Sequence, residues 1–588
     1  MTDEKNLSRR SLLLGGGAGL AAASLGGCAT TSDASTQRSW DIETDVLVCG
    51  SGAAGGTAAL YAAKAGARVT VIEKGSAWGG TTAKSGCHIW IPNNFELRSR
   101  GVDDDRRACL QYMAQYSYPH LFQPEHPQLG LDTNTFELLA AFYDNGASMV
   151  DEMMAWKAFR FRAAKIWTNG KYTPDYFDHS PWNQVPRGRG LEPIDSDGRF
   201  AAGKGVVDTM RQALLAEGCT LVMRHRAEQL VLDGAGAVIG LLARNDDGQE
   251  VAIRAQRGVV FATGCYSHNQ EYLRQYQMDP VFGTCAVPTN EGDFIPIAGA
   301  VGAQLANMAG AWRGQVVLED TLRYKAVPAV VYWPPGDSML LVDRSGKRCV
   351  NEKRGYNDRV RQLYNFDASA AGYPHLLTFM VYDQRTADLR AGNHPIPPLP
   401  EAAPYVIVGD TLEQLSQRIQ ERLATLASHT GGIELEDAFS DQLQATVERF
   451  NNMARAGVDT DFGRGNYRED QDWSNYTPPK QGTQWEPQSE LNATLYPLQA
   501  KGPYYAIILA PGLLGTNGGP KVNAQAEVLD YQNKPISGLY AAGNCMAHPA
   551  ANAYWAAGAT IGSALTFGKI AGQQVALRQS MGAQEETL

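Results

Sequence analysis

The 588-residue sequence lacks the paired cysteine motifs that bind metal ions or attach haem. Its nine cysteines are scattered, and no C-x-x-C or C-x-x-C-H stretch occurs, which gives no zinc pair and no c-type haem. Nine is an odd number, and no disulfide framework stands out. Several of these cysteines lie in apolar or glycine-rich runs that are typical of small core residues. We therefore expect no metal site.

The sequence also lacks an excess of positive charge. Its net charge is −10, which argues against nucleic acid as a partner. No internal repeat and no low-complexity tract divides the chain. A hydrophobic content of 44% over this length is enough to build two or more domains around large cores.

The N-terminal apolar run, residues 12–25, is too short and too rich in glycine to predict a membrane span. Arg9 and Arg10 precede it in the twin-arginine pattern that directs the export of folded proteins. Residues 25–28 resemble a lipoprotein processing site, with Cys28 as the lipidated residue. The alternative is a chance cysteine near an ordinary cleavage site. We expect an exported protein at the periplasmic or extracytoplasmic face of the membrane, with Cys28 as a candidate lipid anchor.

Residues 45–73 have the pattern of a strand, a glycine-rich turn, a small-residue helix and a second strand. Gly50 allows the tight turn, Gly52 lets backbone approach a pyrophosphate, and Gly55 lets the helix pack close to the strand. Glu73 ends the second strand, where a carboxylate can accept hydrogen bonds from ribose hydroxyls. We call residues 45–73 the fingerprint stretch, residues 50–55 the fingerprint turn, and Gly50, Gly52, Gly55 and Glu73 the fingerprint residues. The stretch predicts that a dinucleotide binds with its phosphates at the helix N-terminus.

Four further stretches can bring backbone against the same ligand. Residues 79–86 are dense in glycine and hydroxyl side chains, although a flexible loop is the alternative there. Residues 259–264 and 539–544 are strands that end in turns, and residues 558–564 open a small-residue helix with free N–H groups. Besides the four fingerprint residues, the predicted cofactor-binding residues are Ala53, Ala54, Lys74, Gly80, Thr81, Thr82, Ser85, Gly86, Ala227, Thr263, Gly264, Gly543, Asn544, Gly558, Ala559, Thr560 and Ile561.

The composition changes along the chain predict an α/β fold with an insertion. Residues 41–310 are the predicted first part of a Rossmann-like dinucleotide-binding domain. Residues 496–588 have the same pattern of strands, turns and small-residue helix and are its predicted C-terminal part. Between them, residues 311–495 are rich in aromatics and prolines and predict an inserted α+β catalytic (cap) domain. Residues 1–40 are the predicted signal and linker.

From residue 45 to the C-terminus, these motifs resemble the FAD-dependent fumarate reductase/succinate dehydrogenase flavoprotein superfamily. Within it, residues 80–94, 502–505 and 514–519 look most like the 3-ketosteroid dehydrogenases. The resemblance implies an FAD cofactor, an FAD domain interrupted by a catalytic domain, and an active site between them. It also implies a small-molecule substrate, a 3-ketosteroid or related enone.

Two positions distinguish the branches of this superfamily. Fumarate reductases carry an arginine five residues after the asparagine of a G-x-R-[FC]-x-N-E motif. Here residues 346–352 match that motif, and the fifth residue after Asn351 is Tyr356. The place of a second arginine, near the C-terminal glycine helix, holds Tyr554. Tyrosine cannot make the bidentate clamp that arginine makes on a carboxylate, so the resemblance favours the ketosteroid branch.

The resemblance assigns a role to each matching residue. Tyr356 is the base that takes a proton from the carbon next to the ketone, and Tyr554 with Gly558 donates to the ketone oxygen. Tyr176 matches a third family tyrosine, with Tyr172 as the alternative. The implied reaction is 1,2-desaturation, with hydride transfer to flavin N5. A base needs a pKa below the usual value of about 10, which helix dipoles or Tyr176 would supply.

Other interpretations stay open at this point. Trp90 and Trp555 can line an apolar steroid slot or can be core residues. Ala556 stands where 4,5-desaturating relatives tend to carry serine, which favours the 1,2 bond. The alternatives are an exported fumarate reductase-like reductase of another enone or acid, a 4,5-desaturating ketosteroid dehydrogenase, and a flavoprotein that only passes electrons to a partner. The electron acceptor, whether a quinone, a soluble carrier or oxygen, is not identified by the sequence.

Overall fold

The computed structural model describes residues 39–277, 279–398, 403–474, 476, 479–480 and 492–579. The predicted twin-arginine pattern and Cys28 lie outside these residues. Within the described part of the chain, no helix is both long and apolar enough to cross a membrane. The same residues contain no group of three or more His, Cys, Asp or Glu side chains placed to hold a metal ion.

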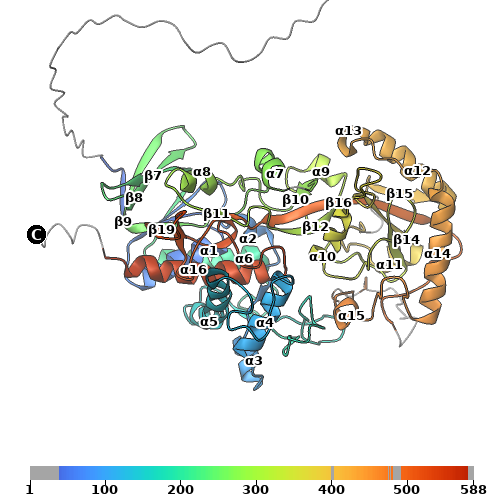
Figure 1. Ribbon diagram of the computed structural model, residues 1–588, viewed down its shortest axis with the longest axis horizontal. Coiled ribbons are helices and arrows are strands. Elements are labelled where there is room, and N and C mark those ends of the chain that lie inside the picture. The colour runs from blue at the N-terminus through green and yellow to red at the C-terminus, as the bar shows by residue number, and fades with distance from the viewer. Residues whose placement is uncertain are drawn as a thin grey trace, which may run out of the picture. The chain divides into compact units, whose positions relative to one another are not determined.

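The first sheet is built around the fingerprint stretch. Its eight strands are β1 (Ile42–Cys49), β2 (Val69–Glu73), β6 (Thr220–Met223), β7 (His225–Leu232), β8 (Val238–Asn245), β9 (Glu250–Phe261), β18 (Glu527–Leu529) and β19 (Pro535–Ala541). The central strands are parallel, in the order β19-β9-β1-β2-β6 (Figure 1). β2 and the C-terminal half of β1 are buried, which explains their continuous apolar sequence.

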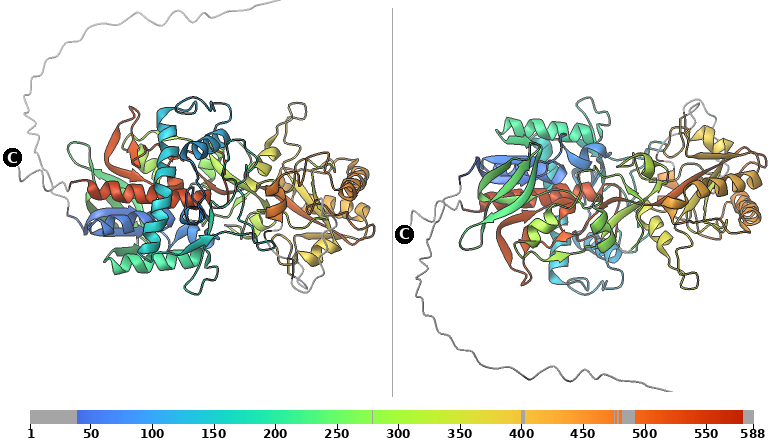
Figure 2. Two further views of the ribbon diagram at one scale, coloured as in Figure 1. Left: turned by 90° about the horizontal axis from the view of Figure 1, so that it is seen from below. Right: turned by 90° about the horizontal axis from the view of Figure 1, so that it is seen from above.

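Two of four helices, α1 (Ala53–Lys64) and α16 (Ala559–Leu577), pack against this sheet, and the other two, α5 (Thr133–Ala155) and α6 (Ala202–Ala216), pack on α16 and α1. Figure 2 shows α16, α1 and α6 in a row, with α5 crossing them. The predicted α/β architecture, a parallel sheet with helices packed on it, is therefore present.

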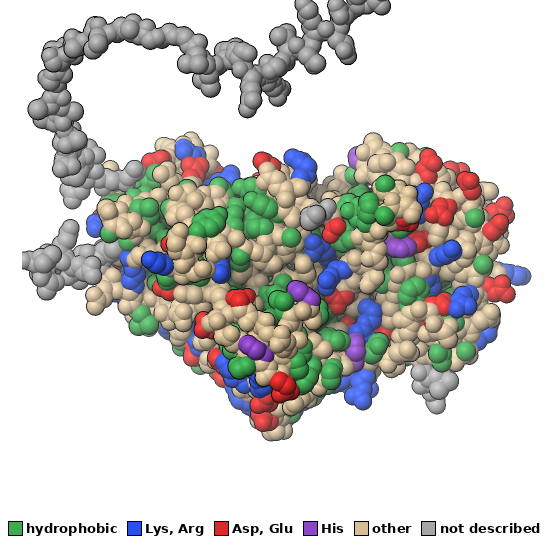
Figure 3. All heavy atoms as spheres, viewed as in Figure 1, with side chains coloured by type: hydrophobic (Ala, Val, Ile, Leu, Met, Phe, Trp, Pro, Cys, Tyr) green, Lys and Arg blue, Asp and Glu red, His purple; other side chains and the backbone are tan. Residues whose placement is uncertain are grey.

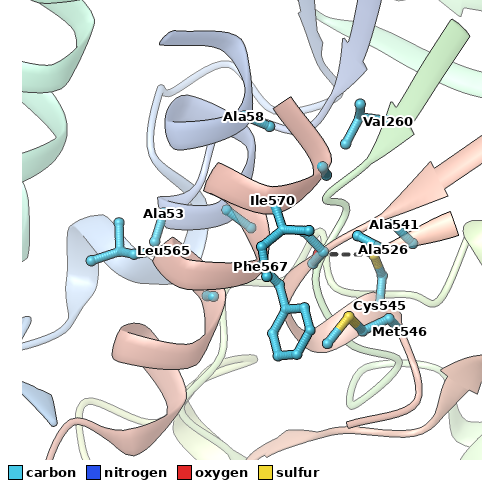
Figure 4. Close-up of a cluster of buried hydrophobic side chains, with 14 of the residues drawn as sticks. Ala53, Ala58, Val260, Ala526, Ala541, Cys545, Met546, Leu565, Phe567 and Ile570 are labelled. Carbon is cyan, nitrogen blue, oxygen red and sulfur yellow. Dashed lines mark hydrogen bonds between the residues drawn. The ribbon is translucent and has the colours of Figure 1, made fainter. Parts of the chain in front are cut away.

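Small residues let α16 lie close to α1 (Figure 4). A Cβ atom at Gly568 would lie 2.5 Å from the carbonyl oxygen of Ala54, and one at Gly572 would lie 2.4 Å from that of Ala58. Both distances are shorter than any ordinary contact, so only glycine fits. The close helix pair fixes the N-terminus of α16 beside the fingerprint turn.

The second sheet draws on all three predicted segments. Its strands are β10 (Gly283–Thr284), β12 (Ala311–Val317), β13 (Met339–Val342), β14 (Thr378–Asp383), β15 (Val406–Gly409) and β16 (Tyr504–Thr516). β16 pairs with β10, β12, β14 and β15, although it falls in the segment predicted to complete the FAD domain. Helices α12 (Leu412–Thr425) and α14 (Phe439–Ala456) contribute their apolar faces to the core beneath it.

The remaining α-helices and strands are mostly short, and the strands among them form a three-stranded and a two-stranded sheet. They are α2 (Gly80–Lys84), α3 (Phe95–Ser99), α4 (Arg106–Ser117), α7 (Gln270–Tyr276), α8 (Phe294–Gly299), α9 (Asp320–Arg323), α10 (Tyr356–Arg361), α11 (Gln384–Leu389), α13 (Ala427–Thr430), α15 (Arg468–Ser474), β3 (Ile89–Trp90), β4 (Phe161–Ala163), β5 (Gly190–Pro193), β11 (Leu305–Ala306) and β17 (Gly519–Pro520). On the face seen in Figure 3, acidic and basic side chains are interspersed.

Candidate active site

One pocket brings together the fingerprint turn, α2, the N-terminus of α16 and residues of the second sheet. The predicted cofactor-binding residues that line it are Gly50, Gly52, Ala53, Ala54, Glu73, Lys74, Gly80, Thr81, Thr82, Ser85, Gly86, Ala227, Thr263, Gly264, Gly543, Asn544, Gly558, Thr560 and Ile561. The structure therefore gathers segments that are far apart in sequence around one space.

Two predicted cofactor residues do not line this pocket. A Cβ atom at Gly55 would lie 1.9 Å from the carbonyl oxygen of Gly50, so Gly55 is required by the packing of α1 on the turn. The N–H of Ala559 donates to the carbonyl oxygen of Ala556 at 3.1 Å, so it is not free for a ligand. Both residues therefore support the segments that line the pocket without lining it themselves.

The carboxylate of Glu73 is held by the turn that it was predicted to accompany. Its Oε2 accepts from the N–H of Ser51 at 3.0 Å and from the Ser51 hydroxyl at 2.6 Å. Its Oε1 accepts from the N–H of Gly75 at 2.7 Å. These three bonds fix the acid at the end of β2, facing the pocket.

The lining residues fit a dinucleotide cofactor. Gly50 has a φ of +105°, and a Cβ atom there would lie 2.4 Å from the carbonyl oxygen of Ala262. A Cβ atom at Gly52 would meet only Thr82 Oγ1 and the Gly79 carbonyl, at 3.5 Å and 3.8 Å, so the protein itself does not require glycine there. The hydroxyl of Thr263 is buried without a hydrogen-bond partner among the described residues. A bound group would explain both observations.

Three tyrosines converge in the same pocket. Ring centroids of Tyr176 and Tyr356 are 5.6 Å apart, those of Tyr176 and Tyr554 are 5.7 Å apart, and those of Tyr356 and Tyr554 are 5.4 Å apart. The competitor, Tyr172, does not line the pocket, and its ring packs under the guanidinium of Arg100 instead. The structure thus brings together the predicted catalytic tyrosines and favours Tyr176 over Tyr172. Their roles stay predictions.

Tyr356 begins α10, and buried ion pairs fix the segment before it. Arg348 Nε lies 2.8 Å from Glu352 Oε1, and Arg348 Nη2 lies 2.8 Å from Asp459 Oδ2. Within α10, Arg359 Nε donates to Gln315 Oε1 of β12 at 2.9 Å. The G-x-R-C-x-N-E motif therefore acts here as a scaffold that presents the next helix.

Gly558 lies at the start of α16 with a φ of +94°. A Cβ atom there would lie 2.5 Å from the carbonyl oxygen of His88 and 2.5 Å from the N–H nitrogen of Ile89. The backbone of residues 88–89 therefore presses directly against this position, and only glycine fits. This contact places the start of α16 beside Tyr554.

Burial sets the protonation of the three phenols. It raises the pKa of Tyr356 well above its usual value, and the neighbouring Tyr176 and Tyr554 raise it further. The pKa of Tyr176 is raised well above its usual value by burial first and by Tyr554 second. Burial also raises the pKa of Tyr554. The expectation that the surroundings lower the pKa of Tyr356 is therefore wrong.

Of the two interpretations of Trp90 and Trp555, pocket wall or core, the structure agrees with the core. Trp90 and Trp555 are fully buried, 5.6 Å apart, and neither lines the pocket. Trp312, Trp333 and Trp473 line it instead, and Trp333 stacks on Trp473 at 4.4 Å. Tyr332, Tyr476 and His88 also line the pocket and were not predicted. No motif marks these residues, because their common position depends on contacts between distant segments.

No arginine is among the residues of the described chain that line the pocket. Its lysines are already engaged. Lys74 Nζ lies 2.9 Å from Glu291 Oε2 and 2.7 Å from Asp293 Oδ2. Lys84 Nζ donates to the carbonyl oxygens of Cys285 and Val327 at 3.0 Å and 2.5 Å. Near the tyrosines the walls are aromatic and apolar, which suits a ketone better than a dicarboxylate.

The comparisons with known proteins cover nearly the whole described chain. A family model for the FAD binding domain matches residues 45–561. The sequence is 31% identical to the 4-oxocyclohexanecarboxylate 2-dehydrogenase of Sinomonas cyclohexanicum, over 90% of this chain and 92% of that protein. The chain is an FAD-dependent oxidoreductase of the ketosteroid dehydrogenase and fumarate reductase family. The predicted fold class and the FAD cofactor of this oxidoreductase are confirmed.

Two further relatives of the oxidoreductase are named for steroids. It is 27% identical to the 3-oxosteroid 1-dehydrogenase of Mycolicibacterium smegmatis, over 91% of this chain and 97% of that one. The structure of a 3-ketosteroid delta1-dehydrogenase from Sterolibacterium denitrificans, in complex with 1,4-androstadiene-3,17-dione, matches with a TM-score of 0.75. That match has 25% sequence identity and covers 91% of this chain and 99% of the other.

The space at Gly52 gives a test of the FAD site in this oxidoreductase. Gly52→Val should yield folded protein without flavin, because a Cβ atom there meets no protein atom closer than 3.5 Å and the added side chain occupies the approach to the pyrophosphate. Gly55→Ala is the matched control and should instead destabilise the fold, because its Cβ clashes with Gly50. Flavin absorbance per protein and thermal unfolding would separate the two. A yellow, stable Gly52→Val protein would contradict the placement of the pyrophosphate.

Proposed function

We propose that the protein desaturates a cyclic ketone next to its carbonyl group, most specifically the 1,2 bond of a 3-ketosteroid. The observation that carries this proposal is the convergence of Tyr176, Tyr356 and Tyr554 in a pocket whose described lining has no arginine. Phenols can hydrogen-bond a ketone and exchange protons at carbon. A dicarboxylate needs cationic partners that this wall lacks.

The role of each residue follows from where charge develops on the substrate during the reaction. The Tyr554 hydroxyl and the Gly558 N–H donate to the ketone oxygen as it gains negative charge, which acidifies the neighbouring C–H bond. Tyr356 takes that proton. Tyr176 is buried, lies against both other rings and orients Tyr356. Bound FAD supplies the acceptor for the hydride that leaves the adjacent carbon.

The named relatives support this reaction and suggest a second substrate. Two are named for 3-oxosteroid or 3-ketosteroid 1-dehydrogenation, and another is named for 4-oxocyclohexanecarboxylate. All three names describe a ring ketone. The 31% identity to the cyclohexanecarboxylate enzyme makes a small ring ketone the second candidate substrate.

The test is anaerobic mixing of the purified holoprotein with a panel of ketones while the flavin absorbance is followed. We expect 3-ketosteroids to bleach the oxidised flavin, with the 1,2-dehydro compound as product. 4-Oxocyclohexanecarboxylate bleaching the flavin instead would select the second candidate. A 4,5-dehydro product would instead identify the protein as a 4,5-desaturating ketosteroid dehydrogenase. Fumarate oxidising the reduced flavin, with no ketone active, would overturn the proposal.

A further inference from the structure

The first three residues of β12 contact the two chain segments that carry Tyr356 and Tyr554. The register between β12 and β16 shifts between Trp312 and Arg313, so the ladder is irregular at this point. Such irregularities re-aim backbone and side chains and are frequent beside active sites. Here the irregular strand end is tied to both tyrosine segments.

On the Tyr356 side, the contact is made by Asn357, the next residue of α10. Its Oδ1 accepts from the backbone N–H of Arg313 at 2.9 Å. Its Nδ2 donates to the backbone carbonyl of Asn552 at 2.8 Å. Asn357 is 1% exposed, so water does not replace either bond.

On the Tyr554 side, three donors from the same strand end bind the Tyr554 loop, residues 546–558, which precedes α16. Trp312 Nε1 donates to the carbonyl oxygen of Ala553 at 2.9 Å. Arg313 Nη1 and the N–H of Ala311 donate to Asn552 Oδ1, at 3.1 Å and 3.3 Å. The Trp312 ring also packs edge-on against Tyr554, with centroids 5.8 Å apart.

We propose that Asn357 is a positioning residue that sets the distance and angle between Tyr356 and Tyr554. Besides the contact between the Tyr356 and Tyr554 rings themselves, the Asn357 side chain links α10 to the Tyr554 loop by a hydrogen bond to its backbone. α10 has six residues and the loop has no regular structure, so neither segment fixes this geometry alone. The inference rests on the proposed function, in which proton removal and ketone polarisation act on neighbouring atoms of one substrate. A misplacement of about 1 Å in such a pair costs about 10²-fold in rate.

Two variants separate positioning from simple stability. Asn357→Leu removes both bonds, and we expect flavin reduction to slow by about 10–100-fold with the steroid dissociation constant changed by less than about threefold. Asn357→Asp has both bonds when its carboxyl is protonated and loses one when it ionises. Burial and the Asp358 carboxylate, 3.4 Å from Asn357 Nδ2, favour the protonated form, whereas Arg313 opposes it.

The sign of the pH dependence follows from this difference. In Asn357→Asp, the rate of flavin reduction should be nearly that of the wild type at low pH. As pH rises, it should become about tenfold or more slower than the wild-type rate. Asn357→Leu should be slow at every pH. The matched control is Asn94→Asp, since Asn94 is equally buried and bridges backbone groups outside the pocket. It should lower the unfolding temperature without changing the ratio of its rate to wild type across pH.

The measurements are stopped-flow flavin reduction by a 3-ketosteroid between about pH 6 and 10, steroid binding from the flavin spectrum, FAD content and thermal unfolding. Wild-type rates per bound FAD in both Asn357 variants at every pH would overturn the inference while the proposed function stands. The same would follow if rate loss in these variants only matched their loss of FAD. A wild-type flavin that no ketone reduces would overturn the proposed function, and the inference with it.

Discussion

Tyr356→Phe should slow flavin reduction by a 3-ketosteroid by about 10²–10⁴-fold, the usual contribution of a general base. The substitution keeps the ring that packs against Tyr176, Tyr332 and Trp333, so FAD content and unfolding temperature should change little. The measurement is stopped-flow reduction with a steroid carrying hydrogen or deuterium next to the ketone. Tyr382→Phe makes the same chemical change at a buried tyrosine outside the pocket and should leave the rate unchanged.

The wild-type rate should also depend on pH in a defined direction. Tyr356 acts as a base only when ionised, and burial raises its pKa well above the usual value. The reactive fraction is therefore small near neutral pH and grows as pH rises, so the rate of flavin reduction should increase across the neutral and alkaline range. This rise should vanish in Tyr356→Phe. A wild-type rate that falls with rising pH, or a fast Tyr356→Phe protein, would exclude Tyr356 as the base.

Tyr554→Phe should cost about 10²–10³-fold in flavin reduction, or about 3–4 kcal/mol of transition-state stabilisation, because one donor to the developing oxyanion is lost. The Gly558 N–H would remain, so the reaction should not stop. Proton removal and hydride loss should slow together, since both depend on the stabilised enolate, and the deuterium isotope effect should persist.

A comparison of two substrates tests the same role of Tyr554 independently. The reduction rate with a saturated 3-ketosteroid and with its 4-ene analogue should fall by a similar factor in Tyr554→Phe, because both present the same oxygen. If the variant matches the wild type with either ketone, the phenol has no part in binding that oxygen.

The FAD-binding half of the fold was predictable because its signal is local. Strand, turn, helix and second strand follow one another within residues 42–73, and two of the turn glycines, Gly50 and Gly55, are required by close backbone contacts. The position of β16 was not predictable in the same way. Its 13 residues have the length and apolar character of a central strand, but its partners are set by sheet pairing across more than a hundred residues.

The same difference between local signals and long-range contacts applies to the residues of the candidate site. Tyr356 and Tyr554 were found because each has a fixed spacing from a motif. For Trp90 and Trp555 the sequence left pocket wall and core both open, because composition near a motif does not say on which side of a chain segment the ring packs; both are core residues. Asn357 carried no signal, since its importance lies in two hydrogen bonds to distant backbone groups.

The pairing of β16 and β19 has a consequence for how the chain is made. β19 completes the parallel order beside β9, and β16 is the strand on which β12, β14 and β15 assemble. Both strands emerge from the ribosome only after residue 504 of 588. Until then, the earlier strands of each sheet have unpaired edges that are open to aggregation. We therefore expect neither sheet to be complete until the last part of the chain has been made.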